Sequence, residues 1–592
     1  MHKADQCSRA AELEEYLGDP HDPGSRMPFA RIMEYDESGQ YPHGFVSQLH
    51  RWGVHEYCLP AEYGGREGNV ETGFNLIRLV SRRDPSSAVA LMLTNVAFMP
   101  VQIAGNEAQQ RELIAEISRG GAMSWGLTER AHGSDLIANE MRAEKVPGGY
   151  LLTGEKWLIG NATVASKMLV HARTGERPGP SAYSILLVDK WRLDAGTVEE
   201  LPGEKLHGLR AMDISGLRLN GAFVPDSALV GKEGQGLELA LKAVQVARTC
   251  VSSIALSAVD TGLRLTLDFT EGRVILGQVV SDVPYSRRQL TEAFADLMVA
   301  DAVSLGAVRS LQVAPEQSSV WSSVAKYFLP TLLERTMSQL NVVLGARMFL
   351  PGHPRYGVYS KLLRDLLVTN FADGNTVVNL RNLGHQLDGL LATATGDSAQ
   401  AREKAVTRAA TLFGMDCPLP VYRPERQELF SRGMDDALLA APDGLLQLRS
   451  LAKEAKKEEE RQWIERAADA AQDLLDLAGV LMDESAALRA GLGRSYGQSA
   501  ELLDLAKQYA VLHATAASVL TFVHSHQVFD EPLPSGALLL LQVERLSKQF
   551  FPHQSLTGPA DIDEVMRVLR RMYQQNRLFS HWQFQLASGN PG

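Results

Sequence analysis

Cysteine is scarce in this chain, and its few positions form no recognisable pattern. The 592 residues include four cysteines, Cys7, Cys58, Cys250 and Cys417, and these lie far apart. Such spacing provides neither a metal-binding pair nor a disulfide framework, and it suits a reducing compartment. We therefore expect a cytoplasmic protein without a metal site.

Long apolar runs and an excess of positive charge are also missing. No apolar run approaches the roughly 20 residues that a membrane helix needs. The polar, acidic start MHKADQCSRAAELEEY does not resemble a secretory signal. The net charge of −11 argues against a nucleic-acid surface. These absences argue against membrane contact and against a nucleic-acid partner.

Several common enzyme motifs are lacking as well. The sequence contains no P-loop, no Rossmann glycine fingerprint and no His-Glu-x-x-His zinc helix. The content of hydrophobic residues, 45%, is ordinary for a soluble globular protein. The chemistry of the protein therefore depends on residues outside these three motifs.

The pattern of apolar residues changes twice along the chain. Apolar residues recur at helical spacing up to about residue 120, and short β-branched segments broken by Gly and Pro follow. Long helical patterns then continue almost to the end. We expect four domains: an N-terminal helical domain (1–121), a middle β domain (122–232), a C-terminal helical bundle (233–395) and an extra helical domain (396–592).

The segment MSWGLTERAHGSDL is the first candidate for a binding loop. Gly126, Thr128, Gly133 and Ser134 are small or hydroxyl residues at the entry to the strand region. Such a loop can bring backbone N–H groups close to an anionic ligand. Taken alone, the segment is better explained as a plain turn between a helix and a strand.

A resemblance to a known family strengthens the binding interpretation. The segment resembles the acyl-CoA dehydrogenase signature, in which Thr-Glu-Pro is followed by Gly-Ser-Asp. Other segments resemble that family in the family's own order: LPAEYGG, YLLTGEKWLIGNA, HGLRAMDISGLRLNGAFVP, GKEGQGLELAL and LLRD. These matches extend over about residues 30–390. The resemblance implies a mainly α fold with an N-terminal helical domain, a middle β-barrel and a C-terminal four-helix bundle, with FAD bound between the last two.

The resemblance also implies roles for individual residues of the first loop. Thr128 would hydrogen-bond the flavin ring, and Ser134, next to Gly133, would contact the FAD pyrophosphate. Trp125 and Leu127 would lie beside the isoalloxazine ring.

Further cofactor contacts are implied elsewhere in the chain. Trp157 and Leu158 fall where the family places a tryptophan against the flavin, although core packing would explain Trp157 equally well. Arg273 matches an arginine that reaches FAD in a neighbouring subunit, a charge-assisted contact. Gly345 lies in a turn that resembles the one near the adenine. The role of Arg273 implies a homo-oligomer, either a dimer or a tetramer.

The sequence departs from the family pattern at several of these sites. Arg130 replaces a proline, and Gly160 stands where the family has a threonine that contacts flavin N5. Leu276 replaces a phenylalanine near Arg273, and Ala346 and Met348 replace two glycines of the adenine turn. FAD binding is therefore expected with contacts that differ in detail.

The stretch NFADGNT, residues 370–376, is either the polar end of a helix or the site of a catalytic base. In the family, a glutamate follows the arginine of Leu-x-Arg-Asp by nine residues, and the same count from Arg364 reaches Asp373. A slip of one residue would place Ala372 there instead, with no base. The resemblance favours Asp373 as the base, with a side chain one methylene shorter than the usual glutamate.

Neighbouring residues complete the implied site. Arg248 matches an arginine that supports the catalytic loop, and Asn375 and Thr376 are predicted to contact the cofactor. The C-terminal extension resembles, in position and length, that of the very-long-chain acyl-CoA dehydrogenases, and we expect it to serve packing or dimer formation.

The resemblance implies an FAD-dependent oxidoreductase that carries out α,β-dehydrogenation of an acyl thioester bound to CoA or to a carrier protein. A role in a specialised biosynthetic pathway fits the positions at which the sequence departs from the family pattern. The alternative is an atypical flavin oxidase or monooxygenase, which would form an epoxyketone from a β-keto acid or act like nitroalkane oxidase. A catalytically inactive relative is a third possibility. Electrons would pass to an electron-transfer partner or to O₂, and the sequence does not identify the acyl group.

Overall fold

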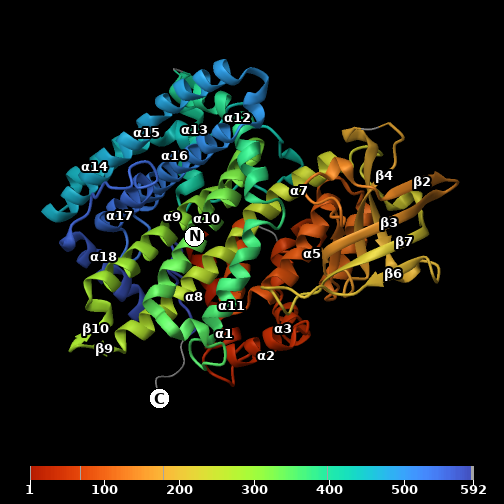
Figure 1. The fold of residues 1–592 in the computed structure, drawn as a ribbon, viewed down its shortest axis with the longest axis horizontal. Coiled ribbons are helices and arrows are strands. Elements are labelled where there is room, and N and C mark those ends of the chain that lie inside the picture. The colour runs from red at the N-terminus through yellow and green to blue at the C-terminus, as the bar shows by residue number, and fades with distance from the viewer. Residues whose placement is uncertain (1, 67–68, 178, 397, 588–592) are drawn as a thin grey trace. The chain divides into compact units, whose positions relative to one another are not determined.

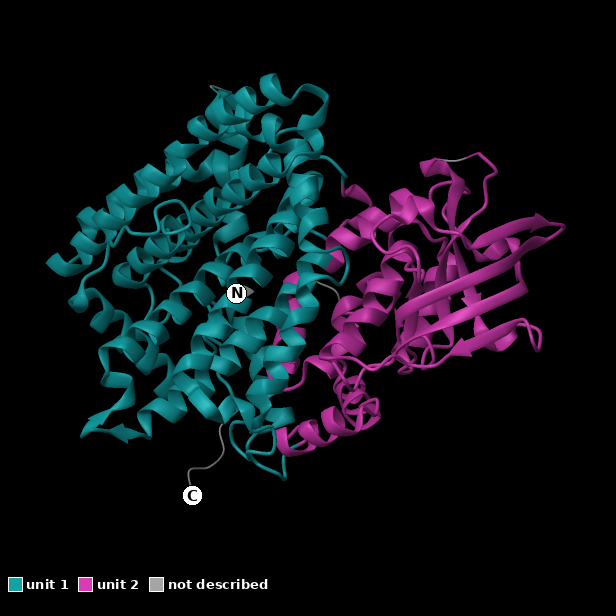
Figure 2. Ribbon diagram, in the orientation of Figure 1, with its two compact units in different colours: residues 1–25, 248–421, 428–592 teal, residues 26–247, 422–427 magenta. Residues whose placement is uncertain are grey.

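The protein divides into two compact units (Figure 2). The computed structural model describes residues 2–66, 69–177, 179–396 and 398–587. Unit 1 comprises residues 1–25, 248–421 and 428–592, and unit 2 comprises residues 26–247 and 422–427.

Unit 2 begins with a group of helices (Figure 1). They are α2 (Phe29–Ser38), α3 (His43–Trp52), α4 (Val70–Ser81), α5 (Pro85–Ala104) and α6 (Glu107–Ser118). Helix α5 begins where Asp84 accepts hydrogen bonds from the backbone N–H groups of Ser86 and Ser87 at 3.2 and 3.0 Å. Asp84 thus caps the helix and leaves fewer amides unsatisfied at its start. Most residues of α5 are buried, so it forms the centre of this helical group.

A mixed sheet of eight strands follows the helices. The strands are β1 (Met123–Gly126), β2 (Arg142–Val146), β3 (Gly149–Gly160), β4 (Lys167–Arg173), β5 (Tyr183–Asp189), β6 (Val198–Leu201), β7 (Ile214–Pro225) and β8 (Leu229–Val230). Their order is β6-β7-β3-β2-β4-β5-β8, and β1 pairs in parallel with β4. The two longest strands, β3 and β7, pair antiparallel along their length.

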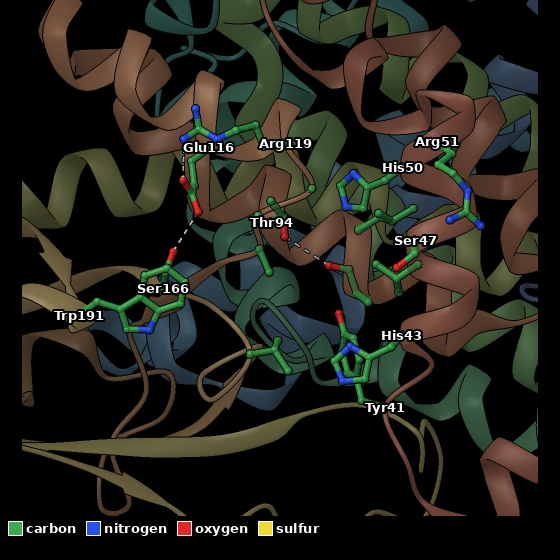
Figure 3. A pocket seen from close by; sticks show the side chains of 17 residues that line it. Tyr41, His43, Ser47, His50, Arg51, Thr94, Glu116, Arg119, Ser166 and Trp191 are labelled. Carbon is green, nitrogen blue, oxygen red and sulfur yellow. Dashed lines mark hydrogen bonds and ion pairs between the residues drawn. The ribbon is translucent and has the colours of Figure 1, made fainter.

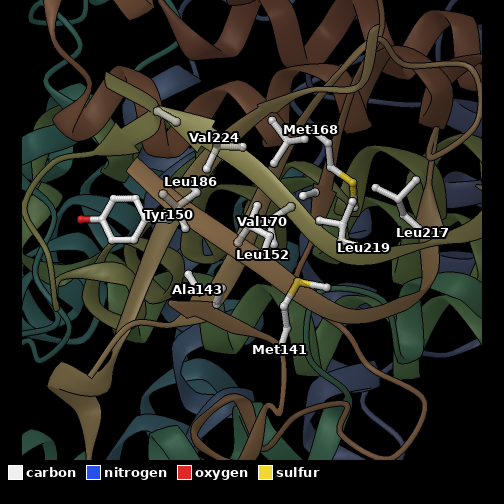
Figure 4. Packing of buried hydrophobic residues seen from close by; sticks show 14 of the residues in the cluster. Met141, Ala143, Tyr150, Leu152, Met168, Val170, Leu186, Leu217, Leu219 and Val224 are labelled. Carbon is white, nitrogen blue, oxygen red and sulfur yellow. The ribbon is translucent and has the colours of Figure 1, made fainter. Parts of the chain in front are cut away.

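Alternation along these strands builds the core of the sheet (Figure 4). Residues two apart on a strand point to the same face, and the inward set is apolar. Its members include Met141, Tyr150, Leu152, Met168, Val170, Leu186, Leu217, Leu219 and Val224. The buried face fixes the register, because a slip of one residue would expose the whole set.

Unit 1 is helical and centres on a bundle. Its main helices are α8 (Ser252–Glu271), α9 (Pro284–Val313), α10 (Ser318–Leu344) and α12 (Thr376–Thr395), with the shorter α11 (Gly357–Leu366) alongside α8. The end of α7 (Gly236–Cys250) also belongs to this unit from residue 248 onward. A short hairpin, β9 (Val274–Ile275) and β10 (Gln278–Val279), joins α8 to α9. The resemblance did not indicate these two strands.

Additional helices complete unit 1 (Figure 1). They are α1 (His2–Leu17), α13 (Ala399–Phe413), α14 (Asp436–Glu454), α15 (Glu458–Leu492), α16 (Ala500–Ser525), α17 (Gly536–Ser547) and α18 (Pro559–Gln574). Helices α16, α17 and α18 each contact α9. The expected fold class, mainly α with a central β domain and extra C-terminal helices, is confirmed. The four domain limits stay a prediction.

The segment after α18 returns to the bundle and buries several apolar side chains. The backbone N–H of Phe579 donates to Asp260 at 2.8 Å, and that of His581 donates to Asp301 at 2.8 Å. The backbone N–H of Ala587 donates to Glu14 of α1 at 3.0 Å. The two ends of the described chain are therefore joined through hydrogen bonds.

The expectation about apolar runs requires a correction. Two helical stretches, Pro85–Ala104 and Gly236–Glu271, are long and apolar enough to cross a membrane by length and composition. Most of each stretch is buried inside the protein. Core helices of soluble proteins have the same property, so the two stretches are weak evidence for membrane contact.

Candidate functional site

The end of β1 and the loop that follows it carry most of the predicted flavin contacts of unit 2. Trp125 is half-buried, and its Nε1 is a buried donor without a partner among the residues that the structure describes. Leu127 and Thr128 are half-buried, whereas Gly133 and Ser134 are exposed. A buried N–H without an acceptor is costly, so a ligand that accepts a hydrogen bond from Trp125 would stabilise this loop.

A buried ion pair holds the loop in place. Lys156 Nζ lies 2.7 Å from Glu129 Oε1 and also donates to the carbonyl of Leu127 at 3.2 Å. Glu129 in turn accepts from the backbone N–H of Met141 at 3.1 Å. Burial lowers the pKa of Lys156 to about 8, and the charge of Glu129 opposes that shift. Sequence reasoning missed this pair, although Glu129 and Lys156 lie inside the TER and GEKW motifs.

Trp157 and Leu158 lie at an irregularity of β3. The pairing with β7 shifts register between Trp157 and Ile159, and Leu158 has a φ of 59° and a side chain that is 40% exposed. Trp157 Nε1 donates to Glu204 at 2.7 Å, and the guanidinium of Arg130 lies 4.7 Å from its ring centre. The bulge therefore turns Leu158 outward, while Trp157 is held by a carboxylate and a cation.

Gly160 ends β3 against helix α5. A Cβ atom at this position would lie 2.2 Å from Leu93 Cδ1. Real Cβ contacts are essentially never so short, so something must shift, and the atom in question is the far end of a flexible, half-buried side chain. The threonine that the family carries at this position would therefore require the tip of Leu93 to move.

Asp373 lies in unit 1, in the loop before α12. It has a φ of 56°, in the left-handed region that is uncommon for a residue with a side chain. Arg248 Nε donates to the backbone carbonyl of Asp373 at 2.9 Å. Burial raises the pKa of the Asp373 carboxyl, and the charges of Lys326 and Arg248 act in the opposite direction. The structure thus places the guanidinium of Arg248 against the backbone of Asp373.

Lys326 is a member of this cluster that sequence reasoning missed. Its side chain is buried in α10, and its Nζ donates to the backbone carbonyl of Thr369. Burial lowers the pKa of Lys326 to about 8, and that of Arg248 to about 10, while the charge of Asp373 raises both. A lone lysine in the apolar stretch SSVAKYFL was the signal that could have identified it.

The loop residues after Asp373 fit closely around Arg248. Gly374 has a φ of 97°, and a Cβ there would lie 2.8 Å from Arg248 Nη2. Asn375 caps α12, since its Oδ1 accepts from the backbone N–H of Val378 at 2.9 Å. Thr376 is the first residue of α12. Asn375 therefore has a structural role beside the predicted cofactor contact.

Gly345 and Arg273, the two remaining predicted cofactor contacts, lie elsewhere in unit 1. Gly345 ends α10 with a φ of 65°, a conformation that glycine adopts without strain. Arg273, at the start of the β9–β10 hairpin, is exposed, and its guanidinium lies 5.6 Å from the ring of Phe269. Leu276, at the hairpin tip, is fully exposed. Arg273 and Leu276 are thus accessible to another molecule.

A separate cavity of about 380 Å³ lies in unit 2 (Figure 3). Tyr41, His50, Glu116 and Trp191 are among its lining residues, and no predicted site residue is. Its Glu116 accepts from Ser166 at 3.2 Å. Burial lowers the pKa of His50 to about 4, so this ring is neutral at pH 7. The residues that the structure describes include no group of three or more His, Cys, Asp and Glu side chains able to hold a metal ion.

The residues described above suit a bound flavin. They differ in one respect from the contacts that the family resemblance implies. The unpartnered Trp125 Nε1 offers a donor, and a Cβ on Gly133 would meet nothing within 4 Å, so the loop is open there. Leu158 presents an apolar surface. At Gly160 no side-chain hydroxyl is available. The chain is therefore able to hold FAD with an altered contact at that position.

Comparisons with known proteins identify the family and the order of its domains along the chain. Three family models match in order: the N-terminal domain of acyl-CoA dehydrogenase at residues 27–121, its middle domain at 124–222 and its C-terminal domain at 234–387. An acyl-CoA dehydrogenase of Bacillus subtilis is 26% identical over 361 residues, which are 59% of this chain and 90% of that protein.

Solved structures show the same fold. Butyryl-CoA dehydrogenase of Megasphaera elsdenii matches with a TM-score of 0.59 and 20% identity, over 65% of this chain and 98% of that one. An acyl-CoA dehydrogenase of Bacillus anthracis, complexed with FAD, matches with a TM-score of 0.70 and 16% identity, over 97% of this chain and 96% of that one. That match includes the C-terminal helices. The chain belongs to the acyl-CoA dehydrogenase family, whose members are FAD-dependent enzymes that act on CH–CH bonds.

Proposed function

We propose that this protein oxidises an acyl thioester to its α,β-unsaturated form, with Asp373 as the base that removes the α-proton. The observation that carries the proposal is the cluster in unit 1 in which the half-buried Asp373 lies beside the buried side chains of Arg248 and Lys326. The α-proton of a thioester is weakly acidic, so its removal requires a positioned carboxylate in a dry environment.

Each member of the cluster has a separate task. Arg248 fixes the backbone of Asp373 through the 2.9 Å hydrogen bond to its carbonyl. Lys326 supplies a positive charge that favours the carboxylate form of Asp373. Burial works against the carboxylate, which makes it a stronger base once it is formed. Asp373 is the proton acceptor, and Arg248 and Lys326 are positioning residues.

The cofactor would be held mainly by the end of β1 and the loop that follows it. Trp125, Thr128 and Ser134 offer hydrogen-bond donors, and Leu127 and Leu158 offer apolar contacts. FAD would supply the hydride acceptor for the hydrogen that leaves the β-carbon. The electrons would then pass to an electron-transfer partner, and the exposed Arg273 fits a homo-oligomer. We expect this protein to be cytoplasmic.

Anaerobic mixing with acyl thioesters tests the proposal. Purified protein is mixed with saturated acyl-CoA of several chain lengths, and bleaching of the flavin absorbance is followed. Wild type is expected to bleach with at least one of them. Asp373→Asn should slow bleaching by about 100-fold or more, which is the usual range for loss of a positioned base.

A matched substitution controls for the change in charge. Asp504 is an acid of the same unit whose side chain is 61% exposed and paired with Lys507. Asp504→Asn should leave the bleaching rate unchanged. If Asp373→Asn reduces its flavin at the wild-type rate, Asp373 is not the base.

A second candidate, oxidase or monooxygenase chemistry on a β-keto acid or a nitroalkane, is favoured by one observation. Leu93 fills the place in which the family carries a hydroxyl side chain, at Gly160. In this case saturated acyl-CoA would not bleach the flavin. Bleaching would follow loss of CO₂ from a β-keto thioester, or reaction with a nitroalkane, and O₂ uptake would follow reoxidation.

A further inference from the structure

The cavity in unit 2 is lined by none of the residues that are predicted to carry the reaction (Figure 3). Its volume of about 380 Å³ lies in the range of about 300–1,000 Å³ that small-molecule sites usually have. Its walls come from α3, α5, the end of α6, the turn after β3 and the segment after β5. All of these elements belong to unit 2, so the cavity is complete within that unit.

Helix α3 presents a row of polar side chains to this cavity. His43, Ser47 and His50 line it at helical spacing (i, i+4, i+7), so they lie on one face of the helix. Figure 3 shows these three side chains along one side of the cavity, and Trp191 and Ser166 on the other side. The α3 wall is therefore the polar side of the cavity.

The ring of His50 offers a free N–H on this wall. Its Nδ1 lies 3.0 Å from Nδ1 of His55, and burial lowers the pKa of both rings to about 4, so both are neutral at pH 7. His55 Nε2 is buried and has no partner among the described residues. A buried N–H without an acceptor is the costlier arrangement, which favours His55 as the donor to His50. The proton of His50 is then on Nε2, on the ring edge away from His55.

Two further donors at this cavity lack partners in the part of the chain that the structure describes. The hydroxyl of the half-buried Tyr41 makes no hydrogen bond there, and burial raises its pKa, so it stays protonated. Arg51 is exposed and makes no ion pair with a described acid. Arg119, by contrast, is paired with Glu116 at 2.9 Å. The uncompensated charge at the cavity is therefore the positive charge of Arg51.

The side of the cavity opposite α3 offers a flat apolar surface. Trp191 lies in the short helix η5 (Lys190–Arg192) and is 81% exposed. Val46, Leu91 and Val164 add apolar lining. Indole rings pack well against other planar rings. A ligand with a planar ring would therefore cover apolar surface that is otherwise open to water.

We propose that this cavity binds a small aromatic carboxylate, with its carboxylate beside His50 and Arg51 and its ring extended toward Trp191. One guanidinium and neutral donors match a single negative charge, which charge-assisted hydrogen bonds would hold. The site does not depend on the proposed oxidation, because no residue of that reaction lines it.

Calorimetric titration of the purified full-length protein with 2-naphthoate tests the proposal. Arg51→Gln should weaken binding about tenfold, because a hydrogen bond to a charged group is lost. Trp191→Ala should also weaken it about tenfold, because the stacking surface is lost. Both side chains are exposed, so the urea midpoint of unfolding should not change in either variant.

Matched controls separate charge, ring and position. Arg111→Gln breaks an exposed pair with Glu107 elsewhere in unit 2 and should leave the affinity for 2-naphthoate unchanged. The alcohol 2-naphthylmethanol keeps the ring without the charge, and cyclohexanecarboxylate keeps the charge without a planar ring. Each of these two compounds should bind wild type at least about tenfold more weakly than 2-naphthoate does.

Three results would overturn the proposal. The first is a wild type that does not bind 2-naphthoate at millimolar concentration. The second is equal affinity in wild type, Arg51→Gln and Trp191→Ala, which would place the binding elsewhere. The third is equal affinity for the acid and the alcohol, which would exclude recognition of the carboxylate.

Discussion

Asp373 combines an uncommon backbone conformation with a charged setting. Its backbone is in the left-handed region, and its carboxyl lies near the buried cations Arg248 and Lys326. Strained backbone persists where the surroundings hold it. Here Arg248 holds the carbonyl, and Gly374 leaves the room that the guanidinium occupies. The short aspartate is therefore placed by its backbone rather than by the length of its side chain.

The pH dependence of flavin reduction depends on Lys326. Asp373 acts as a base only when deprotonated, so the rate should fall as the pH drops through its pKa, which burial raises above the usual range. The charge of Lys326 lowers this pKa. Lys326→Met should therefore move the acidic limb of the rate profile to higher pH, as followed by stopped-flow bleaching between pH 5 and about 9.

Lys326→Arg serves as the control for that prediction. It keeps the positive charge, so its acidic limb should stay closer to that of wild type than the limb of Lys326→Met. An unchanged limb in Lys326→Met would show that this charge does not act on the base.

At the scale of the element, α12 is the helix that begins directly after the base. Its cap, Asn375, accepts from the backbone N–H of Val378. Asn375→Ala should cost about 1 kcal/mol of local stability and increase amide exchange in the first turn of α12. Asn375→Ser retains a capping oxygen and should exchange nearly as wild type does, as measured by hydrogen–deuterium exchange with mass spectrometry.

Flavin reduction adds a second measurement for this helix start. If the cap holds the loop, Asn375→Ala should also slow bleaching, because misplacement by about 1 Å can cost about 100-fold. Faster exchange with an unchanged bleaching rate would mean that Arg248 alone positions Asp373.

The order of elements could be predicted from sequence, but their irregularities could not. Helix and strand periods are local properties, so the change from helical spacing to strands near residue 122 was visible. The Asp373 loop was located by counting from Arg364. The bulge at Leu158 and the contact of Leu93 with Gly160 depend on partners that are distant in sequence. No local pattern reports such contacts.

The same limit applies to the ion pairs of the site. Glu129 and Lys156 are 27 positions apart, and their pairing follows from the return of β3 beside the loop. Their residue types were visible inside recognised motifs, but their partnership required the fold.

At the scale of the whole molecule, a buried ion pair joins the extension to the bundle. Arg545 of α17 donates to both carboxylate oxygens of Asp296 in α9 at 2.8 Å. Their side chains are 12% and 1% exposed. Arg545→Met would leave a buried carboxylate without its main cation, which should cost about 3–5 kcal/mol.

The urea midpoint of unfolding measures this loss. Asp296→Asn/Arg545→Met removes both charges and should recover part of it. Arg571→Met breaks an exposed pair with Glu531 and should cost at most about 1 kcal/mol. An Arg545→Met protein as stable as Arg571→Met would mean that the buried pair does not join the two parts.

The return of the C-terminal segment to the bundle has a consequence for synthesis on the ribosome. Asp260, Asp296 and Asp301 lie in α8 and α9, yet they receive partners from Phe579, Arg545 and His581. These partners are translated hundreds of residues later. Until then the bundle carries acids that lack these partners beside uncovered apolar surface, a state prone to aggregation. The nascent chain is therefore expected to depend on chaperones until translation ends.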